Sequence, residues 1–138
     1  KLRAKGHTVV TDGERGINWA LSTAMGLIAG RVAIELHTNS ASSTFAKGVE
    51  VISQPKDKQL ACLIASKIAG VLNTNIRRAS GWLDPKLVEK ERGFFPGFVR
   101  KGGLIVEVFF QSNLSELEAY EAKKWLVAQA IADALTGD

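Results

Sequence analysis

The chain has 138 residues, 46% of them hydrophobic, and a formal net charge of +4. This length and composition fit one globular domain with a single core, and no run approaches the roughly 18 consecutive apolar residues that a bilayer-spanning helix needs. The single cysteine, Cys62, excludes an internal disulfide and a cysteine-rich metal site. We therefore expect one domain, monomeric and without membrane insertion.

The first half of the chain predicts strands and helices in alternation. Apolar residues come in short runs or with period two where strands are expected, and near helical spacing where helices are expected. A turn at Asp12-Gly13 and a stop at Gly30 bound the first predicted helix. The predicted elements are a strand at 7–11, a helix at 17–30, a buried strand at 32–36, a strand at 49–53 and a long helix after Pro55 that ends near Leu72.

The second half begins with residues 73–103, which show no strong period and hold two of the three prolines. We expect a long irregular segment there, of the kind that is often functional. "LIVEVFF" at 104–110 predicts a buried strand with Glu107 in its middle, and Ser115-x-x-Glu118 predicts the capping box of a last helix that runs to about Leu135. The order of elements predicts an α/β fold: a single domain with a mostly parallel twisted sheet and helices on both faces.

The excess of positive charge is concentrated between Arg77 and Lys101, where seven cationic residues stand against three anionic ones. Such a surface suits a polyanionic partner, such as nucleic acid or a polymer that bears carboxylates. The alternative is a solvated loop kept soluble by its charge. Composition alone leaves both open.

Two residues of the predicted sheet are candidates for chemistry. His37 follows a buried strand, and ligands in α/β sheets collect beyond the carboxyl ends of strands. Glu107 lies inside an apolar strand, where an ionised carboxylate is unfavourable unless it is paired or its pKa is raised. A hydrogen-bonded core histidine and an ion-paired glutamate are the plain alternatives. Together the two residues suggest a metal-bound imidazole and a general base, the division of labour in zinc hydrolases.

The sequence is short of further metal ligands. A catalytic zinc takes about three protein ligands and leaves one position open for water. The other histidine, His7, begins a different predicted strand, so we expect it at the wrong edge of the sheet.

"IELHTNSASSTFAKGVEVIS", followed by a helix, a long segment, "GGLIVEVFFQSN" and a last amphipathic helix, resembles the zinc-dependent N-acetylmuramoyl-L-alanine amidases of cell-wall turnover. The family pattern is a histidine and an asparagine, a small-residue loop into Gly-x-Glu, and later an apolar strand with Glu before Ser-Asn. "GHTVVTDG" and "AKKWLVAQAIADAL" are most similar to compact lysins of phages and prophages of Gram-negative hosts. The resemblance covers essentially the whole chain.

The resemblance implies Zn²⁺ as cofactor and peptidoglycan as substrate. It makes His37 a zinc ligand and Glu107 the catalytic glutamate, which activates a water for attack on the amide between the muramic acid lactyl group and L-alanine. Asn39 and Glu50 match recurrent family positions and are expected to support the site or the substrate. We also expect part of the segment between Arg77 and Lys101 to line a substrate groove, with these candidate residues: Arg77, Arg78, Trp82 and Arg92.

The chain departs from the family at its start. Family members open with a strand that ends in a Gly-His zinc ligand, followed by a helix that supplies a glutamate ligand. "KLRAKGHTVV" corresponds to the end of that helix and the second strand. We therefore interpret residues 1–138 as the C-terminal portion of the catalytic domain, with the other ligands expected upstream of Lys1. A form that has lost its metal site, or replacement ligands at His7 and Glu14, are the alternatives.

A second hypothesis is a catalytically silent module that binds cell wall or nucleic acid through the basic segment 77–101. No basic recognition helix or aromatic platform supports nucleic acid as a partner, and no Gly-rich phosphate loop supports a nucleotide. The start of the chain lacks the apolar stretch of a signal peptide. We expect either the host cytoplasm with release to the wall at lysis, or a periplasmic or extracellular location if a signal lies upstream.

Overall fold

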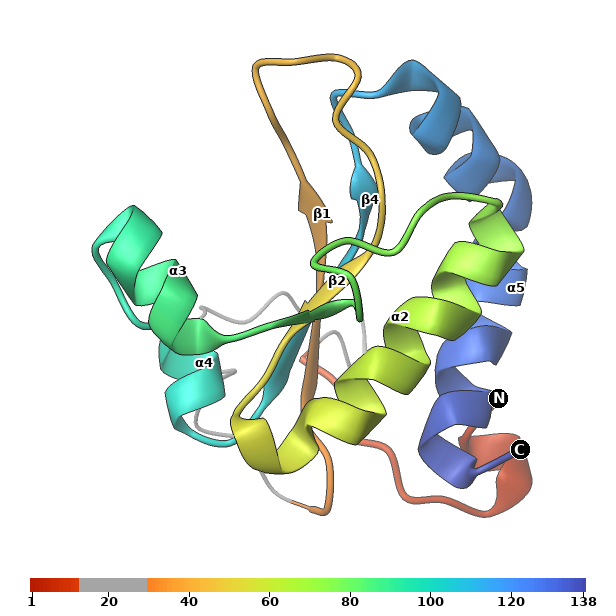
Figure 1. Cartoon of the computed structure of the whole chain (residues 1–138). Helices are drawn as coiled ribbons and strands as arrows, with labels where there is room; N and C mark the ends of the chain where they lie inside the picture. Colours follow the sequence, from red (N-terminus) through yellow and green to blue (C-terminus); the bar gives the residue numbers. More distant parts are fainter. Residues whose placement is uncertain (13–29) are drawn as a thin grey trace.

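A computed structural model describes residues 1–12 and 30–138 of the chain. Strand β4 lies in the middle of its sheet, and all seven of its residues are buried. Figure 1 shows the long helices α2 and α5 side by side on one face of the sheet, and the short helices α3 and α4 on the other. The elements are η1 (Arg3–Lys5), β1 (Ile34–Asn39), β2 (Glu50–Ile52), η3 (Pro55–Asp57), α2 (Lys58–Leu72), β3 (Trp82–Leu83), α3 (Pro85–Arg92), α4 (Gly97–Arg100), β4 (Leu104–Phe110) and α5 (Leu114–Thr136).

Among the described residues, four strands form one mixed sheet in the order β1-β4-β2-β3. β1 pairs with β4 and β2 pairs with β3 in parallel, whereas β2 and β4 are antiparallel. The predicted α/β class, with a mostly parallel sheet covered by helices on both faces, is confirmed. Parallel pairing aligns the carboxyl ends of β1 and β4, the kind of edge at which α/β proteins place their sites.

Two apolar clusters hold the layers together. The larger one packs β2 and β4 against α2 and α5, with Ile64 and Ile68 of α2 fully buried at its centre. The smaller one packs Val88 of α3 and Val99 of α4 under the opposite face, against Ile105. Fully burying an aliphatic side chain contributes about 1.5–3 kcal/mol, so the two clusters fix the sheet between its helices.

Two predictions for the first part of the chain need correction. Residues 7–11 form no strand within the described residues; Val10 is 63% exposed there. β-branched residues alone do not make a strand, because its backbone groups need a partner strand. The strand predicted at 32–36 begins later and ends later, at Ile34–Asn39. It is partly exposed, because β1 is an edge strand of the described sheet. The helix predicted at 17–30 lies almost wholly outside the described residues.

The sequence predicted a long irregular segment at residues 73–103. This prediction is wrong, because the segment contains β3, α3 and α4. Helix α3 has its start and stop signals in the sequence: the Asp84 side chain accepts a hydrogen bond from the backbone N–H of Lys86, Pro85 takes the first turn, and Gly93 closes the helix with φ 79°. The predicted capping box of the last helix is displaced by two residues. Asn113, not Ser115, caps α5 by accepting a hydrogen bond from Glu116 N–H.

Candidate functional site

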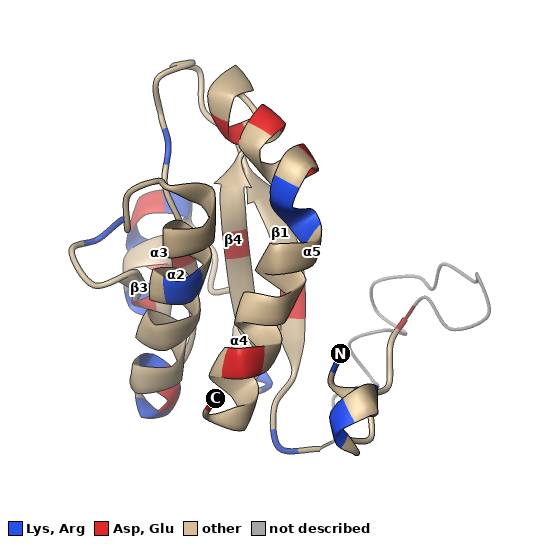
Figure 2. Ribbon diagram, turned by 90° about the vertical axis from the view of Figure 1, so that its right-hand side faces the viewer, with Lys and Arg blue, Asp and Glu red and all other residues tan. Residues whose placement is uncertain are grey.

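The strand register brings ionisable side chains together on one face of the sheet. His37 of β1 pairs with Glu107 of β4, and Glu107 pairs in turn with Glu50 of β2. Paired residues share a face, and residues two apart on a strand return to it, so Glu35 joins them from β1. Ile105, two residues before Glu107, contacts α3 and α4, which identifies this face as the one below the short helices. Within β4 (LIVEVFF), Glu107 is the one acidic residue, and Figure 2 shows acidic colour on that strand.

Glu107 is a buried carboxylate whose side chain is 10% exposed. Its Oε2 atom is buried without a hydrogen-bond partner among the described residues. Burial raises the pKa of Glu107, and the nearby carboxylates of Glu50 and Glu35 add to the rise, whereas the charges of His37 and Arg92 lower it. A carboxylate with a free lone pair and a raised pKa is suited to accept a proton.

His37 lies between two carboxylates. Its Nδ1 atom is 3.9 Å from Glu107 Oε1, and its Nε2 atom is in close contact with Glu35 Oε1. The side chain is 44% exposed, so a ligand can reach it. The pairing of β1 with β4 shifts between His37 and Asn39. A shift of this kind re-aims the side chains next to it, which is common beside active sites.

Glu50 is fully enclosed, with a side chain 1% exposed. Its Oε1 accepts a hydrogen bond from Asn39 Nδ2 at 3.0 Å. Its Oε2 accepts from Arg77 Nε at 3.4 Å and from Arg78 Nε at 3.2 Å. Arg78 also reaches Glu91 on α3, 3.6 Å away. Glu50 is therefore an ion-paired residue that ties β1, β2 and the segment before β3 together.

The four residues predicted to line a substrate groove fall into three places. Arg77 and Arg78 turn inward to Glu50. Arg92, at the end of α3, is exposed, and its charge acts on Glu107. Trp82 shares a face with Val51 and packs against the core under α2, on the face opposite Glu50.

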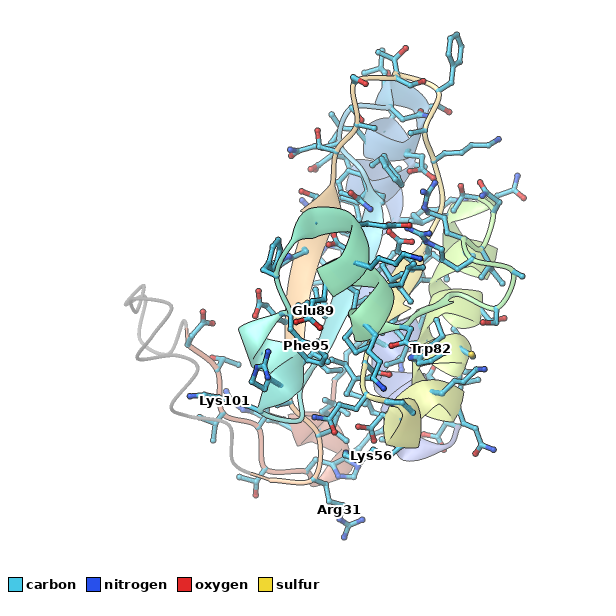
Figure 3. The ribbon with its side chains drawn as sticks, turned by 60° about the vertical axis from the view of Figure 1, so that its left-hand side comes forward. Arg31, Lys56, Trp82, Glu89, Phe95 and Lys101 are labelled. Carbon is cyan, nitrogen blue, oxygen red and sulfur yellow. The ribbon has the colours of Figure 1, made fainter. Side chains whose placement is uncertain are left out.

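Trp82 is held in that position by polar contacts as well as by packing. Its Nε1 donates to the backbone oxygen of Ser53 at 3.1 Å, and Lys58 Nζ lies 4.7 Å from the ring centroid. Figure 3 shows Trp82 beside the start of α2, apart from Phe95 and Lys101 near α4. The alternation of side chains along a strand could have predicted this position, because the two residues of β3, Trp82 and Leu83, must point to opposite faces of the sheet.

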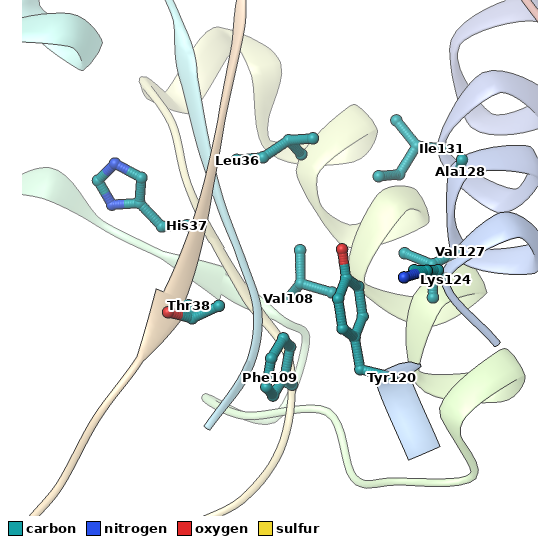
Figure 4. Close-up of a pocket in the computed structure, with 10 residues that line it drawn as sticks. All are labelled: Leu36, His37, Thr38, Val108, Phe109, Tyr120, Lys124, Val127, Ala128 and Ile131. Atoms are coloured by element: carbon teal, nitrogen blue, oxygen red, sulfur yellow. The ribbon is translucent and has the colours of Figure 1, made fainter. Parts of the chain in front are cut away.

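A groove lies on the opposite side of β1. It has a volume of about 460 Å³ and is lined by Leu36, Tyr120, Val127 and Ile131, with His37 at its rim. In Figure 4 the imidazole of His37 points away from this groove, whereas Leu36 points into it. His37 is among the residues that line this groove, whereas Glu107, Glu50 and Glu35 are not.

The cluster matches part of a metal site. A zinc ligand must present an unprotonated nitrogen; Nδ1 of His37 lies 3.9 Å from Glu107 Oε1, and the other carboxylate oxygen, Oε2, has no hydrogen-bond partner among the described residues. Among residues 1–12 and 30–138, however, no three or more His, Cys, Asp or Glu residues are arranged to hold a metal ion. The described residues thus fit one ligand and one base.

Within the same residues, no helix is both long and apolar enough to cross a membrane.

A feature that sequence reasoning missed is Glu35. Its signal was the spacing of two from His37 on a strand, which places both side chains on one face.

Comparison with known proteins gives a consistent result. The family model described as N-acetylmuramoyl-L-alanine amidase matches residues 1–137. A Neisseria meningitidis protein named as such an amidase is 34% identical, with a TM-score of 0.81, over 94% of this chain and 70% of that one. None of the curated proteins compared with the chain matches it.

Two further solved structures are similar. The catalytic domain of CwlV, an N-acetylmuramoyl-L-alanine amidase of Paenibacillus polymyxa var. colistinus, is 25% identical, with a TM-score of 0.63, over 85% of this chain and 62% of that one. The amidase AmiC2 of Nostoc punctiforme shares the fold, with a TM-score of 0.75 at 17% identity, over 99% of this chain and 74% of that one. The chain therefore spans less than two thirds of the CwlV domain and about three quarters of AmiC2.

Proposed function

Because this chain belongs to the N-acetylmuramoyl-L-alanine amidase family, we propose that it hydrolyses the amide between N-acetylmuramic acid and L-alanine in peptidoglycan, with zinc as cofactor. One observation supports the proposal above the others. Glu107 is buried with an unpartnered Oε2, and its Oε1 lies 3.9 Å from the imidazole of His37. A structural carboxylate would be paired, as Glu50 is.

In this proposal Glu107 moves the proton. Its raised pKa keeps the carboxylate basic enough to accept a proton from the attacking water. The same carboxyl group then donates that proton to the departing amine of L-alanine, which balances the reaction. A bound zinc would polarise the water and the scissile carbonyl. His37 would be one of its ligands, and we propose that the others come from outside the described residues.

The surrounding charges prepare the site for this step. Arg77 and Arg78 neutralise Glu50, so that the second carboxylate opposite Glu107 does not act with its full charge. Asn39 fixes Glu50 from β1 and thereby ties the strand of His37 to β2. Arg92 is exposed beside Glu107 and is placed to attract carboxylates of the stem peptide.

The test is digestion of purified peptidoglycan by the protein with and without added Zn²⁺. The proposed reaction releases free α-amino groups of L-alanine and no new reducing sugar ends. Reducing ends without amino groups would indicate a glycosidase and would overturn the proposal. Binding to the wall without either product would favour the silent binding module instead.

We also propose that the protein is a compact lysin, on the resemblance of its sequence to phage and prophage lysins. Such a protein would collect in the host cytoplasm and reach the wall when the membrane is opened. Expression in a Gram-negative host should then leave cells intact until the inner membrane is permeabilised. Lysis without permeabilisation would contradict this location.

A further inference from the structure

The loop between β1 and β2 carries the most exposed large apolar side chain among the described residues. Phe45 is 88% exposed, compared with 74% for Trp125 on α5. It stands in the run "SASSTFAK" at 40–47, whose other members are small, hydroxyl-bearing or, at Lys47, charged. A single exposed apolar residue is ordinary on a protein surface, so what distinguishes Phe45 is how its loop is held and where the loop lies.

The loop at 40–47 is fastened near both of its ends. Near its start, the backbone N–H of Ala41 donates to Ser112 Oγ at 3.1 Å. Near its end, the backbone oxygen of Ala46 accepts from Asn113 Nδ2 at 3.3 Å. Both partners belong to the turn that joins β4 to α5. The loop is thereby fixed against the end of β4, while its middle stays in solvent.

Phe45 lies in a tight turn of this loop. Its backbone N–H donates to Ser43 Oγ at 3.2 Å, and the backbone N–H of Ala46 donates to the Ser43 backbone oxygen at 3.4 Å. The turn satisfies the backbone while the ring stays exposed. A side chain presented on an ordered loop loses less conformational entropy when a ligand binds to it.

The loop lies at the edge of the sheet where His37 and Glu107 are found. It follows β1, which ends at Asn39, two residues past His37. With a rise of about 3.3 Å per residue, the loop starts about 7 Å beyond His37 along the strand. Figure 1 shows the loop extending farther, past the end of β1. It is therefore placed beside the cluster, where a neighbouring part of a long substrate would lie.

We propose that Phe45 binds a sugar ring of the peptidoglycan glycan strand, next to the muramic acid that carries the scissile amide, a role that rests on the proposed function for the identity of the polymer. One face of a sugar ring is lined with C–H groups, which pack on the electron-rich face of an aromatic ring. The hydroxyls at the edge of the same sugar need hydrogen-bond partners, and the exposed hydroxyl residues Ser42 and Thr44 beside Phe45 supply them.

A membrane surface fits the loop less well. Stable attachment to a bilayer takes two signals, such as an apolar group together with a basic cluster. The loop offers one large apolar side chain and one cation, Lys47, among hydroxyl groups that would lose water on insertion without gaining partners. A sugar has both an apolar face and hydroxyls, so the composition of the loop favours a saccharide.

Glycan binding is the first measurement, by NMR titration with glycan strands from which the stem peptides have been removed. These strands contain no scissile amide, so the result does not depend on hydrolysis. Phe45→Ala should weaken binding about 2–10-fold, the loss of one aromatic contact, and Phe45→Trp should restore it. Trp125→Ala is the matched control, because it removes an exposed aromatic ring on α5. Thermal unfolding verifies that each variant keeps its fold.

Hydrolysis of two substrates is the second measurement. On soluble peptidoglycan strands, Phe45→Ala should raise KM about 2–10-fold and leave kcat unchanged, because the contact with the sugar is the same before and during the reaction. On a muramoyl peptide with a single sugar, which lacks the neighbouring ring, both constants should stay at their wild-type values.

The results distinguish the role of Phe45 from the reaction itself. Glycan binding that is equal in wild type and Phe45→Ala, or absent from both, overturns the role of Phe45 whether or not the protein hydrolyses the wall. An equal loss in Trp125→Ala overturns it as well. Binding that depends on Phe45 in a protein without hydrolysis supports the role and overturns the proposed reaction. Sedimentation with phosphatidylglycerol vesicles that is lost in Phe45→Ala, with glycan binding unchanged, would assign the loop to a membrane instead.

Discussion

His37 and Glu107 face each other across the parallel pairing of β1 with β4, with Nδ1 3.9 Å from Oε1. The separation is too long for a hydrogen bond. The imidazole of His37 also contacts the carboxylate of Glu35, and Glu107 lies in β4, a strand that is buried along its whole length. The pair thus combines an imidazole that is 44% exposed with a carboxylate that is 10% exposed.

Glu107→Gln should abolish hydrolysis and leave the protein at least as stable at pH 7. Loss of the base should reduce the rate at least about 100-fold. Because burial raises the pKa of Glu107 in the folded chain, its ionised form is less favourable there than in the unfolded chain. Glutamine removes that penalty.

The stability difference should depend on pH in one direction. As pH falls through the raised pKa, folded Glu107 takes up a proton before the unfolded chain does, so the wild-type protein loses its penalty. Urea unfolding should show the variant more stable at pH 7, with the gap closing toward about pH 4. A variant that is less stable at pH 7 would show that Glu107 is ion-paired in the folded protein.

His37→Ala should eliminate zinc binding and activity with little change in stability. Its side chain is 44% exposed, so truncation leaves no cavity and should shift the free energy of unfolding by at most about 0.5–1 kcal/mol. His7→Ala is the matched control, because His7 is exposed and lies outside the cluster. Metal content after dialysis measures the effect. Zinc retained by His37→Ala, or lost from His7→Ala, would contradict the assignment of the ligand.

The sequence predicted the elements whose pattern is strong over their full length. β4 is a continuous apolar run, and α2 has a clear stripe, so both were predicted at nearly their true bounds. Helix α3 was missed because its eight residues bury only Pro85 and Val88, too few to establish a period. Its cap at Asp84, its proline and its closing glycine were the better signals.

The site was predictable as residue types and not as geometry. His37 and Glu107 were singled out because one follows an apolar run and the other interrupts one. Glu35 and Glu50 lie on the same face only through the register of three strands, which no single segment contains. Glu116 shows the same limit: it accepts hydrogen bonds from Gly48 N–H and Phe110 N–H, two backbone groups far apart in sequence.

Arg92→Ala should lower activity with little change in stability, whereas Arg78→Ala should lower stability. Arg92 is exposed near Glu107, so its loss should leave stability within about 0.5 kcal/mol and weaken hydrolysis most at low salt. Arg78 pairs with buried Glu50 at 3.2 Å. Its loss should destabilise the fold by about 1.5 kcal/mol, since a charged acceptor loses one partner.

Thermal unfolding and the salt dependence of wall digestion separate the two arginines. Lys86→Ala, a change of equal charge on the exposed surface of α3, is the control for net charge. Equal loss of activity in Lys86→Ala and Arg92→Ala would mean that Arg92 acts only through the overall charge. An unchanged melting temperature in Arg78→Ala would mean that the ion pair of Arg78 with Glu50 does not stabilise the fold.

Gly48→Ala should destabilise the fold and disturb the site together. Gly48 has φ 112°, and a Cβ atom there would lie 2.7 Å from Asn75 O and 2.8 Å from Arg77 Cγ. The backbone oxygen cannot move aside, so the strain should amount to about 1–3 kcal/mol, and displacement of Arg77 would loosen its hydrogen bond to Glu50.

Gly70→Ala is the matched control, because a Cβ atom added at Gly70 would have nothing within 4 Å and α2 should gain about 0.5–1 kcal/mol. Urea unfolding and wall digestion of both variants measure the effects. A Gly48→Ala protein as stable and active as wild type would show that the approach of β2 to the 75–77 segment is looser than the structure has it.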